Sequence, residues 1–150
     1  MNPPKIHIKS ISALETHAVR HPVLRPGLPK ETCVFKGDDA PDTFHLGAFL
    51  DQKIVGVLTL MSNPHYACAQ EPNVQLRGMG VLDSERGLGV GAALIRSAEI
   101  QVRQKQIKIM WMNARLIAVP FYQKMGFSIK GAEFDIPVAG PHHYMTKTIL

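Results

Sequence analysis

The stretch Arg86-Gly87-Leu88-Gly89-Val90-Gly91 places three glycines where a segment with helical periodicity begins. Glycines let the backbone approach a ligand closely, and the first N–H groups of a helix have no partner within the helix. Together with the positive end of the helix dipole, these amides can hold a phosphate or a pyrophosphate. We therefore expect an anion-binding turn built from backbone. For the turn alone, a helix start that merely packs tightly is the alternative.

Two common nucleotide sites fit the turn poorly. No GxxxxGK[ST] motif occurs in the chain, which argues against a P-loop nucleotidase. Gly87-x-Gly89-x-x-Ala92 matches the loose dinucleotide pattern, but four residues separate the preceding strand from the first glycine. In addition, the next strand ends in Met112-Asn113 instead of an acidic ribose ligand, and three strands precede the motif.

The elements that must position this turn follow from hydrophobic periodicity and from turn residues. Ser12 is expected to cap the first helix, which ends near His21-Pro22. Asp51-Gln52 is expected to join two strands as a hairpin, and Gly78 and Gly80 are expected to loosen the strand that follows. The expected strands are 5–12, 43–50, 53–61, 74–82, 107–112, 127–132 and 144–150, and the expected helices are 12–19, 88–104 and 116–125. The order is α/β with mixed strand directions.

The long helix over 88–104 is amphipathic. Its apolar residues share one stripe and are Val90, Leu94, Ile95, Ala98 and Val102. Its polar side is expected to hold Arg96, Glu99, Arg103 and Gln104. The aromatic residues Trp111, Phe121 and Phe127 occupy helix or strand positions that are expected to pack in the core.

Composition limits the class of protein. The 150 residues are 45% apolar and 19% charged, which predicts one compact domain over residues 1–150, and the net charge of +5 favours anionic ligands. The longest apolar run, 54–61, is far shorter than the ~20 residues of a membrane span. Met1–Lys5 shows no leader, so we expect a cytoplasmic protein with Cys33 and Cys68 reduced.

The glycine turn and its surroundings resemble the GNAT superfamily of acetyltransferases. Arg86-x-x-Gly89-x-Gly91 is similar to the acetyl-CoA signature of that family, and Pro120-Phe121-Tyr122-Gln123-Lys124-Met125-Gly126-Phe127 resembles its FYxxxGF segment. Further stretches also resemble family strands: Leu76-Arg77-Gly78-Met79-Gly80-Val81, Trp111-Met112-Asn113-Ala114-Arg115 and Gly140-Pro141-His142-His143-Tyr144-Met145. The resemblance implies a mixed, mainly antiparallel central sheet flanked by helices, with two strands splayed at the cofactor site.

The resemblance also implies a reaction. Acetyl-CoA would be the cosubstrate, with its pyrophosphate at the amides of residues 88–92 and its pantetheine along residues 79–81. A primary amine would attack the thioester directly through a tetrahedral intermediate, and a backbone N–H near Val81 would hold the oxyanion. Tyr122 would lie near the sulfur and protonate the thiolate. The implied cofactor-binding residues are Met79, Gly80, Val81, Arg86, Gly87, Leu88, Gly89, Val90, Gly91, Ala92, Asn113 and Tyr122.

Several assignments stay open. For Tyr122 a packed core residue, and for Asn113 a strand-end turn residue, are the alternatives. Arg77 is expected to pair with a carboxylate, recognition of an acidic acceptor being the other reading. The acceptor is a small amine, an amino sugar or a protein lysine, bound by loops at 23–27, 62–73 and 134–143. Candidates for the general base are Glu71, Glu85, Glu133, His142 and His143.

Other protein classes and sites are less favoured. A noncatalytic acyl-CoA sensor would need no acid such as Tyr122, and a basic nucleic-acid-binding protein would leave the glycine turn without a role. His65-x-x-Cys68 lacks a companion pair, and His142 and His143 point to opposite faces of a strand, so we expect no metal site. Another acyl-CoA as donor and a homodimer stay open.

Overall fold

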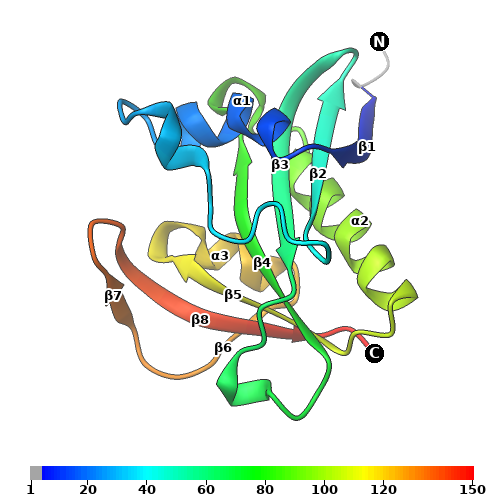
Figure 1. The fold of residues 1–150 in the computed structure, drawn as a ribbon, viewed down its shortest axis with the longest axis vertical. Coiled ribbons are helices and arrows are strands. Elements are labelled where there is room, and N and C mark those ends of the chain that lie inside the picture. The colour runs from blue at the N-terminus through cyan, green and yellow to red at the C-terminus, as the bar shows by residue number, and fades with distance from the viewer. Residues whose placement is uncertain (1–4) are drawn as a thin grey trace. The chain divides into compact units, whose positions relative to one another are not determined.

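The computed structural model describes residues 5–150 (Figure 1). The reading of Met1–Lys5 as free of a leader falls, apart from Lys5, outside the described residues. The chain divides into two compact units, of which unit 1 holds Met1–Met61 and Leu76–Ile100, and unit 2 holds Ser62–Gln75 and Gln101–Leu150. Strand β4 (Asn73–Val81) and helix α2 (Val90–Gln104) each contribute residues to both units.

Unit 1 is built on a sheet whose strands follow one another in the order β1-β2-β3-β4. Strands β1 and β3 both pair antiparallel with β2. The bounds of these three strands are β1 Ile6–Ile11, β2 Phe44–Leu50 and β3 Lys53–Met61. The β2–β3 hairpin confirms the prediction, and Asp51 takes a φ of 54°, in the left-handed region that tight hairpin turns use.

The segment after β1 winds as one irregular helix. Ser12 caps it reciprocally, because Ser12 Oγ accepts the Glu15 amide at 3.1 Å and Glu15 Oε1 accepts the Ser12 amide at 2.9 Å. The helical pieces are η1 Leu14–Thr16, α1 His17–Val19 and the π-helix η2 Arg20–Leu24, followed by the separate turn η3 Lys30–Cys33. The predicted end near His21-Pro22 is therefore too early. The wide turn closed by Arg25 N to Arg20 O spans Pro22 without using its nitrogen.

Helix α2 packs its predicted apolar stripe inward. Val90, Leu94, Ile95, Ala98 and Val102 are all at most 2% exposed. In unit 1 a Cβ built on Gly56 of β3 would lie 2.8 Å from Val90 Cγ1, so this glycine lets the helix approach the strand. The assignment of Glu99 to the solvated side is wrong, because it is 6% exposed. Glu99 follows Ile95 by four residues and therefore shares its face.

Two strands of unit 2 run parallel to each other over a short stretch. The start of β4 runs parallel to β5 from Asn73–Ile109 to Gln75–Trp111, and β5 pairs antiparallel with β8. The short strands β6 and β7 both pair antiparallel with β8. The bounds in this unit are η4 Tyr66–Cys68, β5 Ile109–Arg115, η6 Leu116–Ala118, α3 Val119–Lys124, β6 Ser128–Ile129, β7 Phe134–Ile136 and β8 Gly140–Thr148.

Three boundaries in unit 2 differ from the sequence predictions. Strand β5 continues past Met112 to Arg115, so Asn113 lies within the strand and not after it. Strand β8 begins at Gly140 and not at Tyr144, because the segment expected to be irregular forms β7 and pairs with β8. The strand expected over 127–132 shrinks to β6.

These elements make a mixed α/β fold whose sheet is mostly antiparallel and flanked by helices, in the strand order β1-β2-β3-β4-β5-β8-β6 with β7 on β8. Trp111 and Phe127 are buried as predicted, whereas Phe121 is half-buried. Cys33 and Cys68 are free thiols. Within residues 5–150, no helix combines the length and apolarity that crossing a membrane would need.

Candidate active site

The glycine turn of unit 1 begins after β4 and the 3-10 turn η5 (Asp83–Glu85). Gly87 and Gly89 both adopt a φ of +82°, a conformation that residues with a side chain rarely take. A Cβ built on either glycine would meet no atom within 4 Å, so the turn is open on that side. This openness is what a backbone cradle for a ligand needs.

The backbone amides at the start of α2 are also suited to bind an anionic ligand. Ala93 N donates to Gly89 O at 3.0 Å, which is the first backbone bond of the helix. Within the described residues the amides of 90–92 make no hydrogen bond. They stand at the positive end of a 15-residue helix. Arg86 adds a cation, held 3.1 Å from Asp83 Oδ1 in an exposed ion pair.

The end of β4 is the expected pantetheine strand. Gly78 has a φ of +61°, so one of the two glycines expected to loosen β4 does take an irregular conformation. Gly80 is buried, and a Cβ there would lie 3.1 Å from Val23 Cγ1, whereas Met79 and Val81 are half-buried. Just beyond the strand, Leu82 N donates to Val55 O at 2.8 Å.

Tyr122 and Asn113 belong to unit 2. Tyr122 lies in α3 with 8% of its surface exposed, and its ring meets the rings of Phe121 and Phe127 edge-on at 5.3 and 5.9 Å. Burial raises the pKa of the Tyr122 phenol, so the hydroxyl stays protonated at neutral pH. Asn113 is exposed in β5, opposite Tyr144 of β8.

The candidate bases differ in how they are engaged. Glu71 Oε1 pairs with Lys108 Nζ at 3.1 Å, and Glu85 Oε1 lies 3.7 Å from Lys53 Nζ. His142 is 4% exposed and its Nδ1 lies 2.7 Å from Gly140 O. Glu133 is exposed, and the Nδ1 of half-buried His143 has no hydrogen-bond partner in the described chain. The geometry selects none of the five.

The possible metal ligands His65 and Cys68 make other contacts in the structure. Residues 5–150 contain no group of three or more His, Cys, Asp or Glu side chains able to hold a metal. The His65 ring accepts the Ala67 amide at 3.0 Å and stacks on Tyr144 with 3.9 Å between ring centroids. Cys68 Sγ receives the Tyr144 hydroxyl at 3.6 Å.

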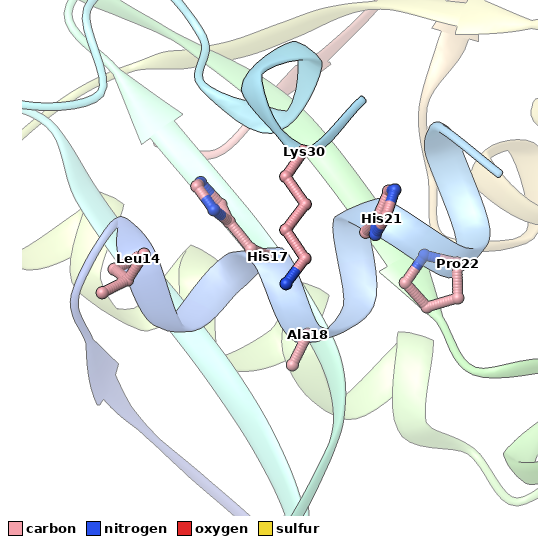
Figure 2. Close-up of a pocket in the computed structure, with 6 residues that line it drawn as sticks. All are labelled: Leu14, His17, Ala18, His21, Pro22 and Lys30. Carbon is pink, nitrogen blue, oxygen red and sulfur yellow. The ribbon is translucent and has the colours of Figure 1, made fainter. Parts of the chain in front are cut away.

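A pocket of about 300 Å³ lies on the helical segment of unit 1 (Figure 2). It is lined by Leu14, His17, Ala18, His21, Pro22 and Lys30. In Figure 2 the Lys30 side chain extends between His17 and His21. Burial, with the nearby charge of Arg20, lowers the pKa of His17. The loop expected to shape the acceptor pocket, 23–27, begins within the last turn of this segment, because η2 ends at Leu24.

A buried ion pair close to β4 was not identified from the sequence. Arg20 is fully buried and forms an ion pair with Asp38 at 2.6 Å. The Arg20 guanidinium lies over the Phe35 ring, and Asp38 Oδ2 accepts the Phe35 backbone amide. Arg77, which was expected to pair with a carboxylate, is held by no ion pair in the described chain and lies over the Phe35 ring instead. Only the fold brings these residues together.

Comparison with known proteins defines the class. The model of the acetyltransferase (GNAT) family matches residues 9–127, and the chain belongs to this family of acyltransferase enzymes. A relative from Bacillus subtilis (strain 168), the uncharacterized N-acetyltransferase YitI, is 33% identical over 144 residues, which cover 96% of this chain and 97% of the relative.

Solved structures show the same fold. Ard1 from Thermoplasma volcanium superposes with a TM-score of 0.77 at 16% identity, covering 97% of this chain and 98% of that one. An aminoglycoside 6′-N-acetyltransferase complexed with coenzyme A also reaches 0.77, at 14% identity, covering 96% of this chain and 97% of that one. The family and the fold expected from the glycine turn and the FYxxxGF segment are thus confirmed.

Proposed function

We propose that this chain transfers the acetyl group of acetyl-CoA to a primary amine by direct attack through a tetrahedral intermediate. The observation that carries the proposal is the open turn at Gly87 and Gly89, followed by unpartnered amides at the start of a 15-residue helix. That turn suits a pyrophosphate without a metal or a Walker lysine. Membership of the family supports it, as does the coenzyme A bound to a protein of the same fold.

Each proposed residue has a role toward the cofactor. The amides of 88–92 with Arg86 bind the pyrophosphate, and residues 79–81 line the pantetheine. Asn113 contributes a hydrogen bond to the cofactor or to nearby backbone. We also propose that the two units make one N-acetyltransferase domain, because the family match runs through both and β4 and α2 are shared between them.

Acetyl-CoA supplies the acetyl group as a thioester, whose carbonyl carbon the amine attacks. A backbone N–H near Val81 donates to the oxygen that becomes negative. Tyr122 gives its hydroxyl proton to the departing thiolate, and its raised pKa keeps that proton in place until then. The proton lost by the amine passes to water or to a candidate base, and a proton returns to the Tyr122 oxygen after the thiol leaves.

Calorimetric titration with acetyl-CoA, CoA, NAD and a short DNA duplex, at two salt concentrations, tests the donor site. Micromolar binding of acetyl-CoA without NAD or DNA binding is the expected result. Salt-sensitive DNA binding, or NAD binding, without affinity for CoA would overturn the proposal. Acetyl-CoA binding without release of thiol from any amine would favour a sensor, and a longer acyl-CoA that binds more tightly would revise the donor.

Exchange of Tyr122 for Phe tests the acid. We expect Tyr122→Phe to bind acetyl-CoA as well as the wild type does but to lose turnover by roughly 10²-fold or more. The comparison variant is Tyr66→Phe, which removes the hydroxyl of an 88% exposed tyrosine in the loop 62–73, so it can alter KM for the acceptor but should keep kcat. Unchanged turnover in Tyr122→Phe would remove the phenol from the mechanism and leave it as a core residue.

A further inference from the structure

Three arginines of unit 1 surround one buried phenylalanine. The guanidinium carbons of Arg20, Arg77 and Arg25 lie 3.9, 4.8 and 5.2 Å from the centroid of the Phe35 ring. The ring itself is 7% exposed. The interaction of each cation with the ring is worth only about 0.5–2 kcal/mol, so stacking alone does little to offset the repulsion among three positive charges.

The Asp38 carboxylate pairs with Arg20. Asp38 Oδ2 and Oδ1 accept Arg20 Nη1 and Nη2 at 2.6 and 3.0 Å, and Oδ2 also accepts the Phe35 amide at 2.9 Å. Arg20 is further held by Cys33 O at 2.8 Å and Thr59 Oγ1 at 2.9 Å. The Asp38 carboxylate is therefore fully engaged by Arg20 and the Phe35 amide, and it makes no ion pair with Arg77.

The guanidinium of Arg77 has N–H donors that no group in the described chain accepts. It is half-buried, and no hydrogen bond or ion pair joins it to another group in the described chain. Burial lowers the pKa of Arg77. The positive charges of Arg20 and Arg25 lower this pKa as well, whereas the negative charge of Asp38 raises it. A guanidinium that has lost part of its water gains more from a bidentate oxyanion than an exposed one does. Beside Arg77, Arg25 Nη1 donates a hydrogen bond to Leu24 O at 3.0 Å.

The backbone of β4 fixes this arrangement close to the proposed thioester strand. A Cβ on Gly78 would lie 2.9 Å from Phe35 Cε2 and 3.2 Å from Arg20 Nε, so the strand presses directly on the cluster. Arg77 precedes Val81 by four residues, which along a strand is roughly 13 Å between Cα atoms. An acceptor whose amine lies near Val81 could thus place a second group several bonds away at Arg77.

We propose that Arg77, with Arg25 beside it, binds an oxyanion of the acyl acceptor, so that the preferred acceptor is a primary amine that also carries a carboxylate or a phosphate. This inference rests on the proposed N-acetyltransferase function for the amine, but the oxyanion site itself can be tested without turnover.

The first experiment measures binding of the anion alone. The full chain labelled with nitrogen-15 is titrated with glutarate and, separately, with inorganic phosphate, while the Nε–Hε signals of the arginines are followed by NMR. The Arg77 signal, assigned from its loss in Arg77→Gln, is expected to shift in a saturable way with one of the two anions. Which anion saturates distinguishes a carboxylate site from a phosphate site.

Matched variants distinguish a specific anion site from a nonspecific effect of positive charge. Arg77→Gln should weaken binding of the anion at least tenfold. The affinity of Arg77→Lys should fall between those of the wild type and Arg77→Gln, because lysine keeps the charge but loses the planar fork of donors. Arg96→Gln is the control, since it removes the same charge from an exposed position on α2. No saturable shift, or equal losses in Arg77→Gln and Arg96→Gln, would overturn the oxyanion site.

The second experiment connects the anion to the acceptor. Thiol release from acetyl-CoA is compared for 6-aminohexanoate against hexylamine and for O-phosphoethanolamine against ethanolamine. The anionic amine of one pair should be preferred, and Arg77→Gln should raise its KM at least tenfold while leaving the neutral amine unchanged. Preference for both neutral amines would overturn the acceptor class.

The two proposals fail separately. Calorimetry with acetyl-CoA is run on the wild type and on Arg77→Gln, which should bind it equally. If acetyl-CoA binds but no anion does, the donor site stands and the present inference is wrong. If anions bind at Arg77 but acetyl-CoA does not, the proposed transferase function is wrong and the oxyanion site stands.

Discussion

The turn at 86–92 and the cluster around Phe35 both concentrate positive potential in unit 1, by opposite means. The turn uses backbone amides, lies open, and is contiguous in the chain. The cluster uses side chains, is largely buried, and draws Arg20 and Arg25 from η2 and its C-terminal end and Arg77 from β4. Charge in the turn therefore depends little on the rest of the fold, whereas charge in the cluster is part of what holds the fold together.

This difference predicts how mutations distribute between stability and binding. Removing a partner from the buried cluster leaves an uncompensated charge away from water, which is costly. Changing a residue of the open turn leaves the core unaltered and acts on the ligand. The same kind of substitution should therefore lower the stability of the fold when it is made in the cluster, and lower the affinity for the ligand when it is made in the turn.

The largest effect is expected for Arg20→Met at pH 7. It leaves the Asp38 carboxylate buried without its cation and should lower the free energy of unfolding by about 3–5 kcal/mol. The matched control is Arg86→Met, which breaks the exposed pair with Asp83 and should cost less than about 1 kcal/mol. Urea unfolding of both variants measures this contrast, and similar losses would remove the distinction between the two regions.

The same distinction explains what the sequence could predict. The glycine turn before α2, the β2–β3 hairpin and the Ser12 cap are local patterns whose residues are close in the chain, and the structure confirms the hairpin, the cap and the open conformation of the turn. The Arg20–Asp38 pair joins residues 18 positions apart, and Arg77 reaches Phe35 from another strand. Periodicity carries no signal for such pairings, which is why Arg77 was assigned a carboxylate partner that the described chain does not supply.

Some predicted boundaries of helices and strands were wrong for a related reason. The segment with Pro137, Gly140 and Pro141 reads as irregular, yet β7 forms there because β8 offers it a partner. The helix past Pro22 likewise continues because a π-turn tolerates the missing amide. Long-range pairing and unusual turns overrode local propensity in both places.

A smaller effect, on binding alone, is expected for Gly89→Asp. A carboxylate at the open turn should weaken acetyl-CoA by about tenfold or more, because it faces the pyrophosphate and opposes the helix dipole. Gly131→Asp is the control: Gly131 has a φ of +87° and equally open surroundings, so the backbone strain is matched. Calorimetry compares the two, and retained affinity in Gly89→Asp would refute the backbone cradle while leaving the buried cluster untouched.

The smallest effect is expected at the Ser12–Glu15 cap, which is local and exposed like the turn but made by side chains. Hydrogen bonds from the Ser12 amide and hydroxyl lower the pKa of Glu15. A lowered pKa in the folded state means that the ionised form stabilises the fold, fully above the ordinary pKa of about 4.3 and less as acid protonates it. Glu15→Gln should therefore be slightly less stable than the wild type at pH 7. That gap should narrow between pH 5 and pH 3, in urea unfolding at each pH. Glu133→Gln, which removes the same charge from an exposed site, should show no such gap, and a Glu15 gap that widens in acid would contradict the cap.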